Sequence, residues 1–231
     1  MSETSTPVLF VSGAGLPPWI WDGVRAELTD HPTYVAPRPA GKDASLADHA
    51  AAALDEVPAE RFVVVAHSAG GMVAAKLLEL QPERVAGLLG VASWVPAPGA
   101  SFVGSLPFPN RLVLSLMMRV LGTRPPEKAL RAQAVGLSVS VADDLVRDFV
   151  PESQRYYRDP TGVVARPRRV GYVCTTEDQM PAKLQRAFAD RLGVERPTEL
   201  GTGHLPMLED PGALRGVIES FARNTSGATP G

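Results

Sequence analysis

Three residues that could together attack an acyl group stand far apart in this chain: Ser68, Asp178 and His204. A serine hydroxyl is a poor nucleophile until a base within hydrogen-bond distance takes its proton, and histidine is a suitable base near neutral pH. A carboxylate then holds the imidazole in the required tautomer and stabilises the imidazolium that forms. These residue types predict acyl-transfer chemistry if the fold brings the three side chains together.

The serine stands at a predicted junction between a buried strand and a helix. Phe62 to Val65 form a continuous apolar run, typical of a strand covered on both faces, and a helix is predicted over residues 69–80. Ala66 and Gly70, two positions before and after Ser68, are small, as a sharp strand-to-helix turn requires. The alternative interpretation is that the serine only caps the helix.

Four histidines could supply the base, and His204 is the one we predict. It follows a predicted strand in a turn bounded by glycines, whereas His31 precedes a proline and His49 lies in a predicted amphipathic helix. Both of those are expected to face solvent. His67 is adjacent to the serine, so its side chain should point elsewhere and serve packing. The alternative for His204 is that it only stabilises its turn.

A carboxylate for this histidine is expected just after the strand predicted over residues 169–175. Asp178 is the preferred residue and Glu177 is the fallback. Either side chain could instead be a favourable charge at the start of the helix predicted from Pro181.

Acyl transfer also requires two N–H donors directed at the developing oxyanion. The backbone N–H of Ala69, directly after the serine, is one expected donor. Ala14 is the other, because it lies between Gly13 and Gly15 in the turn after the first predicted strand, where the backbone can approach a ligand closely. A plain strand-to-helix turn explains that glycine-rich stretch equally well.

Apolar runs that alternate with helical segments predict how these residues are positioned. Strands are expected at residues 8–11, 34–36, 61–66, 84–92, 169–175 and 195–200, with helices between most of them. The pattern indicates the α/β class, with a mostly parallel central sheet of about six strands and helices on both faces. Ligand sites in such sheets gather at the carboxyl ends of the strands, where Ser68, Asp178 and His204 all fall.

The alternation is interrupted over residues 95–167, where proline, glycine and apolar helical segments dominate. We therefore expect a core made of residues 1–94 and 168–224, a helical cap over 95–167, and a disordered tail over 225–231.

The helix expected from Asn110 to Leu121 is apolar nearly all round, which favours a buried helix. Contact with substrate is compatible with that burial, and a membrane-surface or dimer role is the remaining alternative. Trp94, Met117 and Leu205 are the expected substrate-binding residues.

Composition limits the other functions. The chain has 231 residues, a formal net charge of −2 and a pI near 6.1, so no nucleic-acid partner is expected. Cys174 is the only cysteine and lies in an apolar run, which predicts a buried thiol. No stretch is long and apolar enough to span a membrane, and the polar segment Met1 to Pro7 favours a cytoplasmic location.

At this point the chain resembles the α/β-hydrolases, and within them the small esterase and hydroxynitrile-lyase branch, including methylesterase-like enzymes. The matching segments are Val8 to Gly15 with Trp19 to Trp21, Val65 to Gly71, Cys174 to Pro181, and Gly203 to Pro211. The order serine, aspartate, histidine along the chain is also that of these enzymes. The resemblance implies an α/β-hydrolase fold and a triad of Ser68, Asp178 and His204.

Some positions depart from the family pattern. Ser12 stands where the family usually has histidine in the first turn. Hydroxynitrile lyases of this branch carry a threonine and a lysine where this chain has Ala14 and Leu205, so elimination of cyanide is not expected. Related dehalogenases and epoxide hydrolases use an aspartate nucleophile, which Ser68 argues against.

The sequence thus predicts a serine hydrolase that cleaves a carboxylic ester, lactone or thioester with an apolar or aromatic portion. Two alternatives are a ligand-binding or receptor-like protein with the same fold, and an enzyme of acyl transfer, cyclisation or C–C cleavage. A small molecule is the expected partner, and neither a metal nor an organic cofactor is implied. The sequence leaves the oligomeric state open and is compatible with a homodimer.

Overall fold

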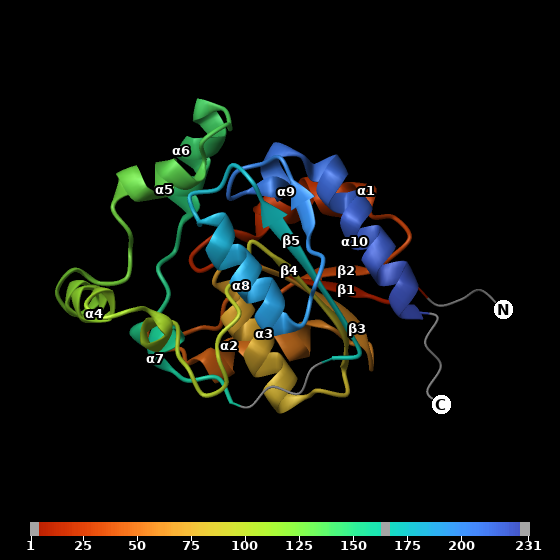
Figure 1. Ribbon diagram of the computed structural model, residues 1–231, viewed down its shortest axis with the longest axis horizontal. Coiled ribbons are helices and arrows are strands. Elements are labelled where there is room, and N and C mark those ends of the chain that lie inside the picture. The colour runs from red at the N-terminus through yellow and green to blue at the C-terminus, as the bar shows by residue number, and fades with distance from the viewer. Residues whose placement is uncertain (1–4, 163–166, 227–231) are drawn as a thin grey trace.

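Six parallel strands form the centre of the computed structural model, which describes residues 5–162 and 167–226 (Figure 1). Their order across the sheet is β2-β1-β3-β4-β5-β6, and every neighbouring pair is parallel. The strands are β1 (Val8–Val11), β2 (Thr33–Val35), β3 (Phe62–His67), β4 (Val85–Val91), β5 (Arg169–Thr175) and β6 (Thr198–Leu200). The predicted parallel sheet is confirmed.

Helices cover both faces of this sheet and divide its core in two. One face carries α2 (Leu46–Glu56), α3 (Gly70–Leu80) and α8 (Ala182–Leu192), and the other carries α1 (Asp22–Glu27) and α10 (Pro211–Ser226). All six residues of β3 are buried, as expected for a central strand that is covered on both faces. The short elements η1 (Pro18–Trp21) and α9 (Pro206–Glu209) lie beside α1.

The insertion between β4 and β5 is helical in its described part. It contains η2 (Val103–Ser105), α4 (Asn110–Leu121), α5 (Glu127–Gln133), α6 (Val139–Asp148) and α7 (Gln154–Arg158). Figure 1 shows α4, α5 and α6 on the left, beyond the end toward which β5 points. Side chains of α5 and α6 join the same core cluster as α1 and α10, so the insertion packs onto the sheet layers.

The prediction that the Asn110–Leu121 helix is buried is wrong. Met118 is its only buried residue, and most of its other apolar side chains are exposed to solvent. An apolar sequence makes burial favourable but does not provide the partner that would cover it. Here the described chain contacts α4 on one side only.

The C-terminal helix is longer than the sequence suggested. Helix α10 continues through Ser226, two residues into the segment expected to be disordered, and residues 227–231 lie outside the described chain. No helix within 5–162 and 167–226 has the length and apolar character needed to cross a bilayer.

Candidate active site

The backbone turns sharply at Ser68, between β3 and α3. Its φ is +50°, a left-handed conformation that is strained for any residue other than glycine. The turn presses α3 against its neighbours: a Cβ atom at Gly70 would lie 2.6 Å from the Ser12 carbonyl oxygen, and one at Gly71 would lie 2.0 Å from that of Trp94. Small residues are therefore required after the serine, as the sequence pattern indicated.

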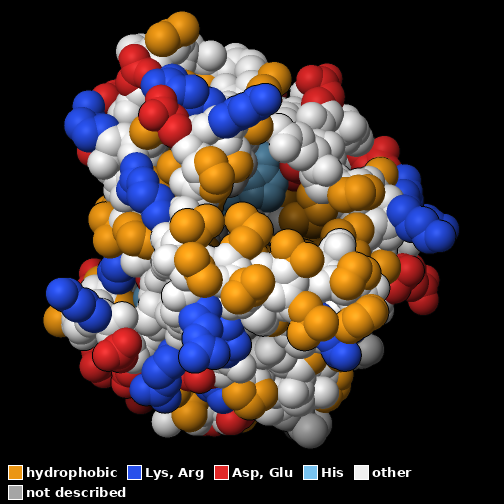
Figure 2. All heavy atoms as spheres, turned by 90° about the vertical axis from the view of Figure 1, so that its left-hand side faces the viewer, with side chains coloured by type: hydrophobic (Ala, Val, Ile, Leu, Met, Phe, Trp, Pro, Cys, Tyr) orange, Lys and Arg blue, Asp and Glu red, His pale blue; other side chains and the backbone are white. Residues whose placement is uncertain are grey.

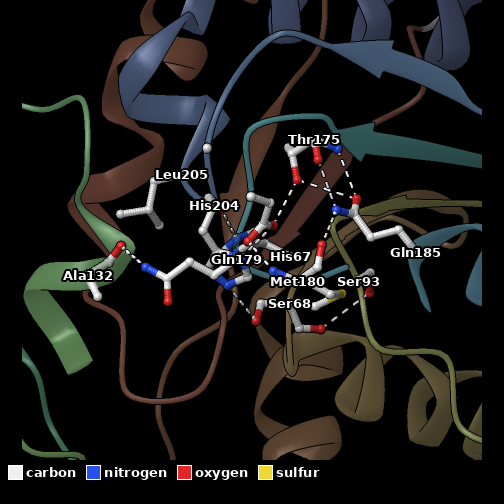
Figure 3. Close-up of polar contacts among 12 residues, drawn as sticks. His67, Ser68, Ser93, Ala132, Thr175, Gln179, Met180, Gln185, His204 and Leu205 are labelled. Carbon is white, nitrogen blue, oxygen red and sulfur yellow. Dashed lines mark hydrogen bonds and ion pairs between the residues drawn. The ribbon is translucent and has the colours of Figure 1, made fainter. Parts of the chain in front are cut away.

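The structure brings Ser68, Asp178 and His204 together, although they are up to 136 residues apart (Figure 3). His204 Nδ1 lies 2.8 Å from Asp178 Oδ2, and His204 Nε2 lies 3.0 Å from Ser68 Oγ. An ionised carboxylate only accepts, so Nδ1–H donates to it and Nε2 is left to accept the serine proton. Each residue follows the carboxyl end of a strand, β3, β5 and β6 respectively.

Asp178, and not the fallback Glu177, is the partner of the histidine. The Glu177 side chain points into solvent, whereas the Asp178 carboxylate is 1% exposed. Burial alone would raise the pKa of Asp178, but the hydrogen bond and charge of His204 outweigh it, with help from Met180 N–H and Thr175 Oγ–H. The net pKa is lowered, so the carboxylate is ionised at neutral pH.

The two expected oxyanion donors are Ala69, which follows the serine in the chain, and Ala14, which follows Gly13 in the first turn. Ala69 is the N-cap residue of α3. Gly13 packs the first turn against Ser68, because a Cβ atom at Gly13 would lie only 3.1 Å from Ser68 Cβ. Within the described chain, the N–H groups of Ala14 and Ala69 donate to no protein acceptor. Both groups are free to bind a ligand oxygen.

Ser12, the departure from the family pattern, has a packing role in this turn. Its Oγ accepts a 3.0 Å hydrogen bond from the indole N–H of the buried Trp21. The hydroxyl therefore anchors the turn to η1.

Comparison with known proteins gives the family. A model described as "Alpha/beta hydrolase family" matches residues 8–217. The chain belongs to the α/β-hydrolase family.

Solved structures agree with this α/β-hydrolase fold. An extracellular α/β-hydrolase from a Paenibacillus species is similar, with a TM-score of 0.79, 19% identity, and coverage of 94% of this chain and 99% of that one. Polyneuridine aldehyde esterase has a TM-score of 0.71, with 16% identity and coverage of 94% and 98%. A pyrethroid hydrolase from Sphingobium faniae has a TM-score of 0.67, with 20% identity and coverage of 94% and 97%. The resemblance to the α/β-hydrolases is confirmed.

Among curated sequences, the uncharacterized protein Rv2715 of Mycobacterium tuberculosis is 24% identical over 270 residues, which cover 96% of this chain and 76% of the relative.

Several residues that hold the backbone of this α/β-hydrolase around His204 were not predicted. The carboxylate of Glu209 accepts the N–H groups of Gly203, at 2.7 Å, and of Leu205, at 3.3 Å, and so holds the backbone on both sides of His204. His67 Nε2–H donates to the carbonyl oxygen of His204 at 2.8 Å. In the sequence, only the position of Glu209, five residues after His204, could have indicated that its carboxylate holds the backbone around the histidine.

His67 is fully buried against Trp21, as expected for a packing residue. Complete burial, with the charge of His204 in second place, lowers the pKa of His67 to about 3. The ring is therefore neutral, and its one N–H is directed at the His204 backbone.

The prediction that His31 and His49 face solvent is wrong. His31 is 5% exposed and its Nδ1 lies 2.8 Å from the Thr6 carbonyl oxygen. His49 is 7% exposed, and its Nε2 lies 3.3 Å from Glu152 Oε2. The insertion supplies that glutamate and covers this face of α2, which helical periodicity alone could not reveal.

Glu152 connects the insertion to the first turn. Its Oε1 accepts the N–H of Gly15 at 3.1 Å and Arg38 Nε–H at 3.0 Å, and its side chain is 6% exposed. The insertion also donates Val150 N–H to the Gly15 carbonyl oxygen at 3.0 Å. Gly15 is therefore held on both sides, one residue after the expected oxyanion donor Ala14.

The predicted substrate-binding residues have different surroundings. Met117 lines a cavity of about 330 Å³ beneath α4, together with Phe102 and Tyr157. Trp94 lines a separate cavity of about 180 Å³ and packs on Phe102, with ring centroids 4.6 Å apart. Leu205 is fully buried in the core, which counts against the substrate contact predicted for it.

A hollow ringed by hydrophobic side chains opens on the face that α4, α5 and α6 share, with a histidine ring visible at its floor (Figure 2). Of the four histidines, His204 alone is not buried. The described residues include no group of three or more His, Cys, Asp or Glu side chains placed to hold a metal ion.

Proposed function

We propose that this α/β-hydrolase cleaves carboxylic esters through an acyl-enzyme on Ser68. The observation that carries the proposal is a pair of hydrogen bonds: His204 Nδ1–H donates to the Asp178 carboxylate, and Ser68 Oγ–H donates to His204 Nε2. If these residues only stabilised the fold, the serine would not need a strained backbone. Its hydroxyl would also not need to face an acceptor nitrogen whose ring is held by a buried carboxylate.

The reaction proceeds in two steps. Ser68 Oγ attacks the ester carbonyl carbon while His204 Nε2 takes the hydroxyl proton, and the imidazolium then returns that proton to the leaving alcohol. Water then attacks the acyl-enzyme while the same nitrogen takes its proton, and the imidazolium returns that proton to Ser68 Oγ as the acid leaves. The N–H groups of Ala69 and Ala14 hold the oxyanion in both steps.

The insertion at residues 95–167 acts as a cap over this site. Its apolar cavity beneath α4 and the apolar rim in Figure 2 favour an ester with an apolar or aromatic group. A lactone or thioester of the same shape fits the same chemistry. The relatives described as a pyrethroid hydrolase and as an esterase support an ester substrate. The cytoplasmic location stays a prediction.

A fluorophosphonate probe tests the nucleophile directly. We expect the intact mass of the wild type to rise by one adduct, and the Ser68→Ala variant to stay unlabelled. Turnover of p-nitrophenyl butyrate should fall at least about thousandfold in Ser68→Ala and in His204→Ala. A folded wild type that takes up no probe and turns over no ester would favour a binding protein instead.

A further inference from the structure

Helix α4 is fixed to the protein on its inner side. Met118 is buried, and its carbonyl oxygen accepts Gln154 Nε2–H at 3.1 Å. Arg158 donates to the carbonyl oxygen of Ser115, also at 3.1 Å. Both donors belong to α7, so the orientation of α4 around its own axis is set by the insertion.

The opposite side of α4 presents apolar side chains to solvent. We call these residues the outer stripe; their exposed fractions run from 55% to 70%, and they are Leu112, Val113, Leu116 and Val120. They recur every three to four positions, so they form one continuous stripe about 12 Å long. Phe108, 69% exposed, precedes the helix. Monomeric proteins rarely leave such a continuous apolar surface without a binding role.

The charges around the outer stripe have one sign. Residues 106–126 contain no aspartate or glutamate, but they contain three arginines. Arg111 and Arg119 are exposed and make no ion pair within the described chain, whereas Arg124 donates to the carbonyl oxygens of Phe149 and Val146. By contrast, Arg131 and Arg147 on the neighbouring α5 and α6 are paired with carboxylates. Arg111 and Arg119 therefore leave positive charge on α4 that no carboxylate of the described chain neutralises.

This charge pattern selects the occupant of the stripe. A second copy that paired through the same helix would set arginine-flanked stripes against each other with no carboxylate between them, which like-charge repulsion opposes. An anionic lipid surface offers both an apolar layer and negative headgroups. Amphipathic helices with apolar residues on one side and arginines beside them lie in such an interface.

We infer that α4 docks this protein on an anionic phospholipid surface, with the outer stripe inserted among the acyl chains and Arg111 and Arg119 at the headgroups. The hollow of Figure 2 opens on the face that carries α4, so a docked molecule would receive apolar compounds from the lipid phase. The docking does not depend on the proposed hydrolysis.

Vesicle flotation with the full chain tests the inference. We compare vesicles of phosphatidylcholine alone with vesicles containing about 30% phosphatidylglycerol. The double variant Leu116→Gln with Val120→Gln removes the centre of the stripe without touching the cavity beneath α4. The matched control is Leu80→Gln, an exposed leucine of α3 outside the stripe, 43% exposed.

The wild type and Leu80→Gln should float with the anionic vesicles, and the stripe variant should bind at least about tenfold more weakly. Arg111→Gln with Arg119→Gln should lose about fivefold per arginine on anionic vesicles and nothing on phosphatidylcholine. Wild type that stays unbound, or a stripe variant that binds like wild type, overturns the inference. So does light scattering that shows a wild-type dimer and a monomeric stripe variant.

Turnover of p-nitrophenyl butyrate, a soluble ester, keeps the two proposals separate. It should be equal in the wild type and all these variants, whether or not they bind vesicles. A wild type that turns over the ester but does not float therefore rejects docking alone, and a wild type that floats without turnover rejects hydrolysis alone.

Discussion

Replacing Glu152 with alanine should damage catalysis although the residue touches neither the nucleophile nor its base. The carboxylate is the acceptor for Gly15 N–H and for Arg38, and it lies 3.3 Å from His49 Nε2. Gly15 has a φ of +76°, and the Phe149 ring occupies the space where a side chain would be, 2.1 Å from the position of a Cβ. The turn therefore depends on its contacts with the insertion for its shape.

The expected loss of stability follows from the interaction that each partner of Glu152 loses. Gly15 N–H becomes a buried donor without an acceptor, which costs about 1–3 kcal/mol. Arg38 is 30% exposed, so water replaces most of its interaction and it adds little. His49, whose pKa is lowered chiefly by burial, is neutral at pH 7 and adds no buried charge. We expect a loss of about 2–3 kcal/mol in the free energy of unfolding.

The expected loss in kcat comes from Ala14 N–H, the expected oxyanion donor next to Gly15. Removal of a whole oxyanion donor lowers kcat by about 10²–10³. A turn that still carries Ala14 N–H but holds it loosely should lose about 10–100-fold in kcat, with KM within about threefold, because the contact is strongest in the transition state. The assay is p-nitrophenyl butyrate turnover at a temperature where thermal unfolding shows both proteins folded.

Glu152→Gln is the matched control, because its amide oxygen still accepts from Gly15 N–H and the side chain keeps its volume. We expect its kcat to stay within about threefold of wild type. If Glu152→Ala is folded and turns over as fast as wild type, the link between the insertion and the oxyanion donor is wrong. A loss confined to KM would also refute it.

Three further outcomes are expected. His67 has a folded pKa of about 3 and an unfolded one of about 6.5, so its stability contribution is complete above pH 6.5 and falls by about 1.4 kcal/mol per pH unit as the pH drops toward 3. Urea unfolding at pH 5 and pH 7 should therefore show a smaller difference for His67→Gln than for wild type. Gly71→Ala sets a Cβ 2.0 Å from a backbone oxygen and should destabilise by more than about 2 kcal/mol, while Gly212→Ala, with its nearest atom at 3.8 Å, should stay within about 1 kcal/mol in the same assay. Cys174 is buried with a raised pKa, so Ellman's reagent should react with it only after denaturant unfolds the chain.

Local pattern was sufficient for the elements that carry the nucleophile. The apolar run before Ser68 and the small residues around it predicted a buried strand, a sharp turn and a helix, and the observed β3 and α3 agree to within one residue at each end. These features depend on neighbours along the chain, whose sterics and burial the sequence displays directly. Chain order and the edge rule for parallel sheets then pointed to His204 and to a carboxylate at Asp178, with Glu177 as the fallback.

Tertiary contacts decided the questions that the sequence pattern had left open. The choice between Asp178 and Glu177 depends on which carboxylate the turn after β5 directs inward, where Thr175 and Met180 hold it. The burial of His49 depends on Glu152, more than a hundred residues later. Neither relation has a sequence period, because each joins segments that meet only in the folded chain.

The sequence alone determined the strand and the sharp turn that carry Ser68, because residue volume and backbone strain act between adjacent positions. Only the tertiary structure decided which side of α4 has a partner and how the insertion holds the first turn. Those outcomes depend on packing between segments that are distant in the chain. The sequence of an apolar helix is the same whether it packs on the protein core or on a surface outside the protein.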